Sequence, residues 1–334
     1  MNKIGIFAGQ FGYDSFDDLC SWGRGEFFRE LKGLCESSNI GVYFGNEAES
    51  EILDFEIHVN YQFRRSNVPK ILLLWESVSL VPKNLLGFSL FSKKYHQIYT
   101  WKMIKGKIYD KRFYYTPIPY SELQVKKSIR SIEDRKYKFS LIATNRNFNI
   151  PVKDKNNGYK LRQKFIDYFD NNSNCGELDL FGRGWNQNFR KFFLHKFSFF
   201  DSPRTFKKVN NHGKVTDKED VLHQSIFNIC LENQLDQPNY YTEKILDCLI
   251  CGAIPIYSGD KSIYKFIPRG CVIECRDFSD ASKVIEYCNS LKNEELITIQ
   301  KNIIKFVSNF NWYEISEKKF AKEIFYKIQK AIKK

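Results

Sequence analysis

Residues 227–260 read FNICLENQLDQPNYYTEKILDCLICGAIPIYSGD, and they are the most informative part of the chain. Its first residues form an apolar run typical of a buried strand, and a polar loop follows. Thr242 is a suitable N-cap for a helix of about nine residues, which Gly252 can end. A second apolar run, at residues 253–257, predicts another strand. A strand, a helix and a strand in this order favour a parallel sheet covered by helices.

The first turn of this helix carries Glu243 and Lys244. A helix N-terminus offers free N–H groups and the positive end of the helix dipole, which together attract anions. A lysine there is unfavourable for the isolated helix, so its position makes sense if an anion lies between its ammonium group and the helix. Glu243 can accept hydrogen bonds from sugar hydroxyls, and Tyr240 and Tyr241 can stack on a base or a ribose. An ordinary capped helix with solvated charges explains the same residues equally well.

The rest of the chain alternates short apolar runs with amphipathic stretches. We predict further strands over residues 3–8, 40–44, 55–59, 70–75, 95–101, 139–143, 178–181 and 271–274. We predict helices over residues 15–35, 159–169, 281–291, 294–309 and 313–334, and an irregular loop over residues 189–212. The result is an α/β protein with two Rossmann-like domains facing a central cleft, residues 1–125 and 126–310, followed by a basic amphipathic helix at residues 311–334. The charged start of the second domain, residues 126–138, suits a linker.

Composition limits the classes of function. The chain has 334 residues, which suggests about two domains. Its 43% hydrophobic residues exclude a wholly disordered chain, and its net charge of +13 should attract nucleic acid, a lipid surface or a phosphorylated small molecule. No apolar run is long enough to span a membrane, and the first residues do not resemble a secretory signal. With nine cysteines, an odd number, we expect the reducing cytoplasm.

Several blocks of the chain resemble the C-terminal signature of glycosyltransferase family 10, the α-1,3/1,4-fucosyltransferases. The signature is a strand ending in Phe-Glu-Asn, then Tyr-x-Thr-Glu-Lys and a helix, then Pro-Ile/Val-Tyr-x-Gly. This chain has Leu231-Glu232-Asn233, Tyr240-Tyr241-Thr242-Glu243-Lys244 and Pro255-Ile256-Tyr257-Ser258-Gly259. Upstream, residues 143–145, the predicted helix that contains Arg162, and residues 180–185 resemble further blocks in the family's order. The resemblance covers roughly residues 138–280.

This resemblance implies a GT-B fold and an inverting transfer of fucose from GDP-fucose, without an essential metal or another cofactor. By position, Arg162 and Lys244 would contact the diphosphate, beside the helix N-terminus at Thr242. Asn233, Tyr240 and Glu243 would hold the nucleotide-sugar. Fixed cations and a helix N-terminus can neutralise the departing GDP where no metal does so.

Two departures from the family pattern concern the donor sugar. Ser258 stands where the family often has Trp, and Asp260-Lys261 follows where a small residue or Asp and then Pro are common. Because these positions should lie near the sugar, a different GDP-sugar or nucleotide-diphosphate sugar stays open as the donor.

An inverting transferase also needs a base that takes the proton of the acceptor hydroxyl. In the family this base is a carboxylate of the N-terminal domain. Glu76 is the candidate, because it follows a predicted buried strand and would face the cleft. A surface glutamate at a strand end is the alternative. Glu26 is the second candidate, although a glutamate inside a helix is more typical of a solvated face.

Other patterns have simpler explanations. Cys248-x-x-Cys251 and Cys271-x₃-Cys275 allow a zinc site, but the first pair falls on a helix that should pack on the sheet, which favours buried thiols. The basic aromatic segment 190–208 suits a lid or acceptor wall better than a nucleic-acid surface. His195 and His212 are expected on its surface.

The predicted partners are therefore GDP-fucose or a related GDP-sugar and an oligosaccharide or lipid-linked glycan acceptor, with no nucleic acid. A surface polysaccharide or lipopolysaccharide acceptor fits this reading. Residues 313–325 of the last helix should pack on the domains, and its lysine-rich end could bind an anionic membrane weakly. The alternative from another class is a non-catalytic protein that binds nucleic acid or an anionic surface.

Overall fold

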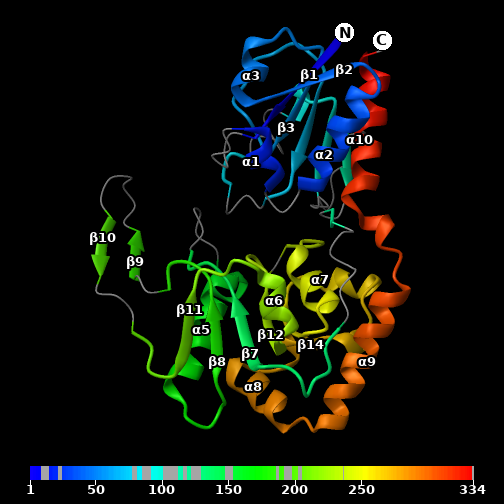
Figure 1. Cartoon of the computed structure of the whole chain (residues 1–334). Helices are drawn as coiled ribbons and strands as arrows, with labels where there is room; N and C mark the ends of the chain where they lie inside the picture. The colour runs from blue at the N-terminus through cyan, green and yellow to red at the C-terminus, as the bar shows by residue number, and fades with distance from the viewer. Residues whose placement is uncertain are drawn as a thin grey trace.

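The computed structural model describes residues 1–8, 15–21, 25–76, 81–84, 92–100, 112–115, 119–121, 129–146, 153–185, 188–191, 198–201, 205–235 and 237–332. Each half of the chain folds around a six-stranded parallel sheet with helices on its faces (Figure 1). The predicted α/β class with two Rossmann-like domains is confirmed.

The N-terminal sheet has the strand order β2-β1-β3-β4-β5-β6. Its strands are β1 (Asn2–Phe7), β2 (Ile40–Phe44), β3 (Phe55–Val59), β4 (Lys70–Leu74), β5 (Gln97–Thr100) and β6 (Phe113–Tyr115). Both β3 and β4 are buried along their whole length, as expected for central parallel strands, although β3 carries Glu56 and His58 between its apolar residues. The short helix α3 (Gly45–Ser50) follows β2.

Residues 15–35, predicted as one helix, form two helices, α1 (Phe16–Ser21) and α2 (Gly25–Glu36). The carbonyl of Cys20, near the end of α1, accepts a hydrogen bond of 2.9 Å from the Arg29 side chain. A Cβ atom at Gly25 would lie 1.7 Å from that same carbonyl oxygen, so the close approach of the two helices requires glycine. The helical spacing of apolar residues could not reveal this break.

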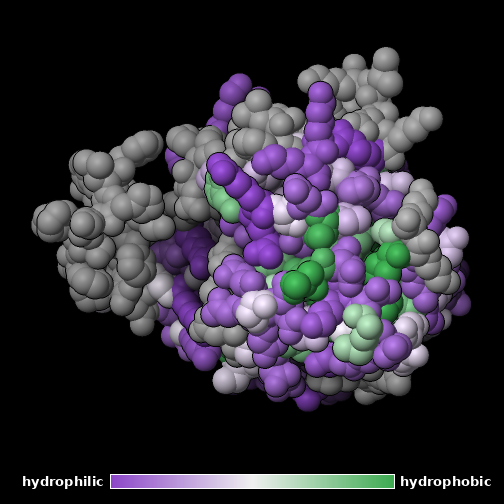
Figure 2. Space-filling view, turned by 90° about the horizontal axis from the view of Figure 1, so that it is seen from above, coloured by the Kyte–Doolittle hydropathy of each residue, from purple (hydrophilic) through white to green (hydrophobic). Residues whose placement is uncertain are grey.

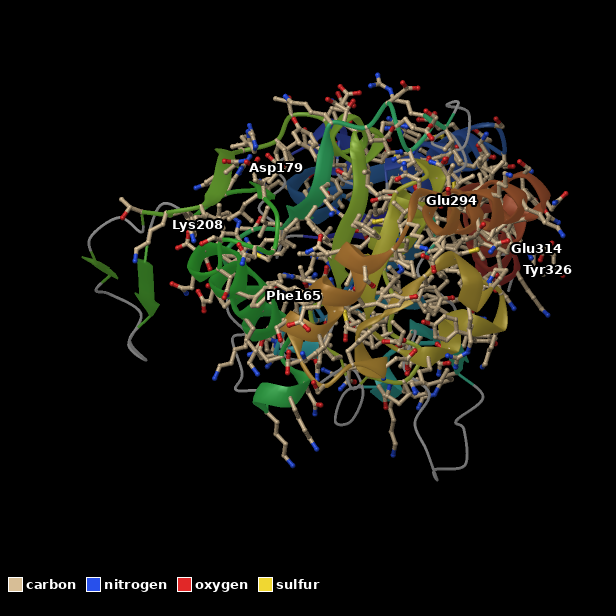
Figure 3. All side chains as sticks on the ribbon, turned by 90° about the horizontal axis from the view of Figure 1, so that it is seen from below. Phe165, Asp179, Lys208, Glu294, Glu314 and Tyr326 are labelled. Atoms are coloured by element: carbon tan, nitrogen blue, oxygen red, sulfur yellow. The ribbon has the colours of Figure 1, made fainter. Side chains whose placement is uncertain are left out.

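The C-terminal sheet has the order β11-β8-β7-β12-β13-β14. Its strands are β7 (Tyr137–Ile142), β8 (Leu178–Phe181), β11 (Val209–Gly213), β12 (Ser225–Leu231), β13 (Ile254–Ser258) and β14 (Ile273–Glu274). Its helices are α5 (Gly158–Asn171), α6 (Lys218–His223), α7 (Glu243–Ile250), α8 (Ala281–Ser290) and α9 (Asn293–Asn309). Phe165 of α5 points into the interior, whereas Glu294 and Glu314 lie at the periphery (Figure 3).

The prediction of an irregular loop over residues 189–212 is wrong. The segment contains β9 (Asn188–Lys191) paired antiparallel with β10 (Ser198–Asp201), and β11 at the edge of the sheet. In β11 only Val209 is fully buried, so this polar edge strand lacks the apolar run that marks the other strands. His212 belongs to β11, where Nε2 lies 2.8 Å from Oδ1 of Asp179. His195 lies outside the described residues.

The last helix, α10 (Glu317–Ile332), returns to the N-terminal domain and lies beside α2 (Figure 1). Phe320, Ile324 and Ile328 are buried in the core of that domain, which confirms the predicted packing. Two connections between the domains also meet, because the N–H of Tyr120 donates to Ile315 (2.8 Å) and the carbonyl of Tyr120 accepts from Glu317 (2.9 Å).

Two surface properties complete the description. Every helix in the described ranges is too short or too polar to cross a membrane. The face seen in Figure 2 is mostly hydrophilic in its coloured part, with hydrophobic side chains in small areas only.

Candidate functional site

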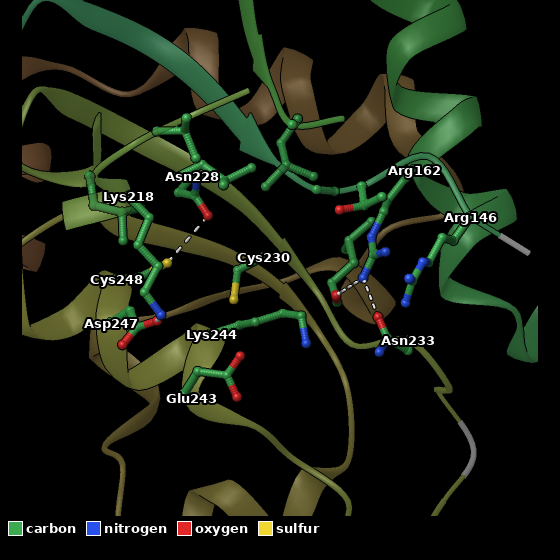
Figure 4. Close-up of a pocket in the computed structure, with 18 of the residues that line it drawn as sticks. Arg146, Arg162, Lys218, Asn228, Cys230, Asn233, Glu243, Lys244, Asp247 and Cys248 are labelled. Atoms are coloured by element: carbon green, nitrogen blue, oxygen red, sulfur yellow. Dashed lines mark hydrogen bonds and ion pairs between the residues drawn. The ribbon is translucent and has the colours of Figure 1, made fainter. Parts of the chain in front are cut away.

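A cavity of about 490 Å³ opens at the carboxyl ends of β7, β8 and β12. Carboxyl ends of parallel strands are where ligands bind in open α/β sheets. The described part of its wall carries six cationic side chains and two acidic ones. The cations are Arg146, Arg162, Arg183, Lys214, Lys218 and Lys244, and the acids are Glu243 and Asp247. Figure 4 labels all of them except Arg183 and Lys214. This excess of positive charge suits an anionic ligand.

The start of α5 places Arg162 at the cavity. The side chain of Asn157 caps the helix by accepting from the N–H groups of Tyr159 (3.0 Å) and Lys160 (3.2 Å). The N–H of Gly158 donates to the carbonyl of Asn233 (3.0 Å), and a Cβ atom at Gly158 would lie 1.8 Å from the carbonyl oxygen of Glu232. Glycine therefore lets α5 begin directly against the end of β12.

Arg162 and Asn233, predicted on separate elements, come together. Nη2 of Arg162 donates to the carbonyl of Leu231 (2.7 Å) and to Oδ1 of Asn233 (2.9 Å). The Arg162 guanidinium also lies 4.8 Å from the centre of the Tyr159 ring. Burial lowers the pKa of Arg162, but an arginine stays protonated at neutral pH. Its orientation at the cavity is thus fixed on two sides.

Thr242 is the N-cap residue of α7, as predicted, but its hydroxyl does not cap the first turn. Instead it donates to Oε2 of Glu232 (2.9 Å), and its N–H donates to Oε1 of the same carboxylate (2.7 Å). Lys244 Nζ donates to the Thr242 hydroxyl (2.8 Å) and to Glu232 Oε2 (3.3 Å). Burial lowers the pKa of Lys244, but the carboxylates of Glu232 and Glu243 outweigh it and raise that pKa. An internal carboxylate therefore already lies beside the lysine for which the sequence indicated an anion.

The two tyrosines before this helix are buried. Tyr240 is only 1% exposed, and Tyr241 packs its ring on Phe266 at 5.5 Å. Neither belongs to the described cavity wall, whereas Glu243 does. Burial raises the pKa of Tyr240 well above its ordinary value, and the carboxylate of Glu76 adds to the rise. Glu76 belongs to the N-terminal domain and is not among the described residues that line the cavity.

Glu76 follows β4 directly, and two asparagines hold its backbone. Its N–H donates to Oδ1 of Asn60 (3.1 Å), and Nδ2 of Asn84 donates to its carbonyl (2.9 Å). Asn84 Nδ2 also donates to Asn60 Oδ1 (2.8 Å). Asn60 adopts a left-handed conformation with a φ of 55°, which asparagine tolerates better than most residues. The sequence did not predict that Asn60 holds the backbone of Glu76, because the two residues are sixteen positions apart and the positive φ of Asn60 leaves no sequence pattern.

Glu26 lies elsewhere. It stands in the first turn of α2, not inside the helix as the sequence indicated, and it is buried rather than solvated. Ser121 Oγ donates to its Oε2 (2.6 Å), and Lys318 Nζ lies 3.5 Å from its Oε1. Both partners belong to the segments that connect the domains, so Glu26 joins these segments to α2.

The cysteines behave as packing residues. Cys248, Cys251 and Cys271 are buried, and Cys248 Sγ donates to Oδ1 of Asn228 (3.3 Å). All nine cysteines are free thiols. Within the described ranges, no group of three or more His, Cys, Asp and Glu side chains could hold a metal ion.

The positions that depart from the resemblance support neighbouring loops. Ser258 is buried, and Asp260 Oδ1 accepts from the N–H groups of Asn239 (2.8 Å) and Ser262 (2.9 Å). Neither Ser258 nor Asp260 is among the described residues that line the cavity. Asp260 instead holds the turn at Asn239, which has a φ of 62°.

Comparison with known proteins gives one family. Residues 155–330 match the model of the glycosyltransferase family 10 (fucosyltransferase) C-terminal region. The alpha-(1,3)-fucosyltransferase FucT of Helicobacter pylori is 32% identical over 116 residues, which are 31% of this chain and 24% of that protein. The match therefore spans about a quarter of the relative's length.

Solved structures share the fold. A crystal structure of an α1,3-fucosyltransferase with GDP-fucose has a TM-score of 0.50 at 15% identity and covers 93% of this chain and 91% of its own. The structure of Anabaena Alr3699/HepE with UDP and glucose has a TM-score of 0.58 at 10% identity, covering 99% of this chain and 100% of its own. Together with the two parallel sheets, these likenesses identify the architecture as GT-B.

Proposed function

Since this chain belongs to glycosyltransferase family 10, the fucosyltransferases, we propose that it transfers fucose from GDP-fucose to a hydroxyl group of a glycan acceptor. The observation that carries this proposal is the pairing of two fixed cations, Arg162 and Lys244, on the wall of one cavity. Nucleoside diphosphates need such groups at the phosphate oxygens. The relative from Helicobacter pylori supports fucose as the transferred sugar.

We further propose that the reaction inverts the sugar and needs no metal. Glu76 takes the proton of the acceptor hydroxyl while the hydroxyl oxygen forms a bond to C1 of the sugar. The bond from C1 to the phosphate oxygen breaks, and the electron pair leaves with GDP. Arg162 can bind two phosphate oxygens at once, and Lys244 acts as a point charge. These cations neutralise the charge that develops on GDP, as a metal does elsewhere.

The acceptor and the location of the enzyme are further parts of the proposal. Nine free thiols are typical of a reducing compartment such as the cytoplasm. Lys327 and Lys330 lie at the lysine-rich end of α10. A basic helix can bind an anionic membrane weakly, which suits a lipid-linked or lipopolysaccharide acceptor.

Calorimetric titration with GDP-fucose, GDP-mannose, UDP-glucose and GDP, with and without EDTA, tests the proposal. We expect GDP-fucose to bind more tightly than GDP-mannose and UDP-glucose, with no effect of EDTA. Binding of GDP-sugars without preference for fucose would keep the family and change the donor. Binding that EDTA abolishes would overturn metal independence.

A second titration distinguishes the proposed glycosyltransferase from a non-catalytic protein that binds nucleic acid or an anionic surface. A non-catalytic nucleic-acid binder should bind oligonucleotides with a steep salt dependence and should not distinguish GDP from GMP. A glycosyltransferase with this cavity should bind GDP more tightly than GMP. In the titrations with GDP and GMP, the Lys244→Ala protein should bind GDP more weakly than wild type does.

A further inference from the structure

The ammonium group of Lys244 is held by hydrogen bonds to Thr242 and to the buried Glu232. Of its three N–H donors, two bond to Thr242 Oγ1 (2.8 Å) and Glu232 Oε2 (3.3 Å) in the described part of the chain. The side chain of Lys244 is 28% exposed, and that of Glu232 is fully buried. The ammonium group therefore has a fixed position on the cavity wall with donor capacity left for a ligand.

The carboxylate of Glu232 organises this arrangement. It accepts from the N–H and from the hydroxyl of Thr242, and the same hydroxyl accepts from Lys244. The three residues form a connected network in which the carboxylate has a partner for each oxygen. Networks around a buried carboxylate are rigid, because each hydrogen bond that breaks removes part of the compensation of its charge.

Glu232 and Asn233 are consecutive residues at the end of β12, and each holds one cation of the cavity. Glu232 holds Lys244, and Asn233 holds Arg162 through Oδ1 (2.9 Å). One strand end thus sets the positions of both cationic groups. Figure 4 shows the side chains of Arg162 and Lys244 extending into the same hollow.

We propose that Glu232 is a positioning residue for the donor, which fixes Lys244 through Thr242 so that the ammonium group meets the diphosphate already in place. This inference rests on the proposed function. A free lysine loses the freedom of four side-chain torsions when it binds a phosphate, and a lysine that is already fixed avoids most of this loss. Glu232 acts through Lys244 and not on the ligand, because it is fully buried and outside the described cavity wall.

The test is a double-mutant cycle on the affinity for GDP. In wild type we expect Lys244→Ala to weaken GDP binding about tenfold, the loss typical of a charged hydrogen bond. In Glu232→Gln the same substitution should cost less than about threefold, because the lysine is no longer held in place. Glu232→Gln alone should weaken GDP binding about tenfold. If Lys244→Ala costs the same factor in both backgrounds, Glu232 does not act through the lysine and the inference is wrong.

Two further variants keep the result interpretable. Glu274→Gln is the matched control, since Glu274 is a buried carboxylate at the end of β14 that bonds to Tyr264 (2.9 Å), and it should leave GDP affinity unchanged. Thr242→Val removes the bridging hydroxyl and keeps the carboxylate, so it should also weaken GDP binding if Glu232→Gln does not fold. Normal GDP affinity in a folded Thr242→Val protein would overturn the inference that Glu232 holds Lys244 through Thr242. Failure of the wild type to prefer GDP over GMP would instead overturn the proposed function.

Discussion

The hydroxyl of Tyr120 donates a hydrogen bond of 2.7 Å to Oδ1 of Asp247, which ties the connection between the domains to helix α7. The other oxygen of Asp247 accepts from Lys218 Nζ (2.5 Å), and both Asp247 and Lys218 line the cavity. Burial raises the pKa of Asp247, and Lys218 opposes that rise. Tyr120 and Asp247 are buried and Lys218 is half-exposed, and together the three residues link the interdomain connection to the cavity wall.

Removing the Tyr120 hydroxyl tests this link. We expect Tyr120→Phe to lower the free energy of unfolding by about 1–2 kcal/mol, because a buried carboxylate oxygen loses a hydrogen bond. Urea denaturation measures the change. The matched control is Tyr326→Phe, whose side chain is 61% exposed, and it should change stability by less than about 0.5 kcal/mol. Equal effects of the two substitutions would show that the bond contributes nothing.

Glu76→Gln should separate turnover from donor binding. The amide keeps the size of the side chain but cannot take a proton, so we expect kcat to fall about 10²- to 10⁴-fold. The dissociation constant for GDP should change by less than about twofold, because the binding cations Arg162 and Lys244 lie in the other domain. Kinetics with a fucose acceptor and calorimetry with GDP measure the two effects.

The control for Glu76 is Glu49→Gln, an exposed glutamate of α3 in the same domain. It should leave both kcat and GDP binding unchanged. Near-normal kcat in the Glu76→Gln protein would show that another carboxylate, and not Glu76, is the base.

The N-terminal domain should lose stability in acid. Burial would raise the pKa of Glu56, but hydrogen bonds from His58 (2.9 Å) and Arg64 (2.9 Å) lower it to about 2. An unfolded glutamate titrates near pH 4.3, so this stabilisation is complete above about pH 4.3 and is lost as the pH falls towards 2. Burial lowers the pKa of His58, which removes stability in the same direction below about pH 6.5.

Unfolding in urea at pH 8, 5.5 and 3.5 checks this expectation. The wild type should lose free energy of unfolding in both intervals. Glu56→Gln should lose much less than wild type between pH 5.5 and 3.5, because it lacks the titrating carboxylate. Parallel losses in the two proteins would show that other groups cause the acid sensitivity.

The sequence predicted the strands well because their signal is local. Strands β2 and β3 have the predicted bounds, although β3 carries Glu56 and His58 between its apolar residues. The polar edge strand β11 was missed because its partner β8 supplies the pairing, which a local pattern does not contain. The prediction of one helix over residues 15–35 did not anticipate that α1 ends at Ser21 and that α2 begins at Gly25.

The candidate site was predicted in part. The resemblance to family 10 pointed to Arg162, Asn233 and Lys244, and the fold brings all three to one cavity. The role of Glu232 was not predicted, because Thr242 lies ten residues further along the chain and only the folded loop brings it to the Glu232 carboxylate. Asn60 precedes Glu76 by sixteen positions and belongs to another strand end, so only the parallel order of β3 and β4 brings them together.

Two glycine substitutions should have opposite effects, and they test how the site is built. A Cβ atom at Gly158 would lie 1.8 Å from the carbonyl oxygen of Glu232, so Gly158→Ala must push α5 away from the end of β12. We expect a loss of more than about 2 kcal/mol in stability and weaker GDP binding, because Arg162 would separate from Asn233. Gly33 lies inside α2 with no heavy atom within 4 Å of its Cβ position, so Gly33→Ala should raise stability by about 0.5–1 kcal/mol. Urea denaturation and GDP calorimetry on both variants check this. A Gly158→Ala protein as stable as wild type would contradict the close approach of α5 and β12 on which the position of Arg162 depends.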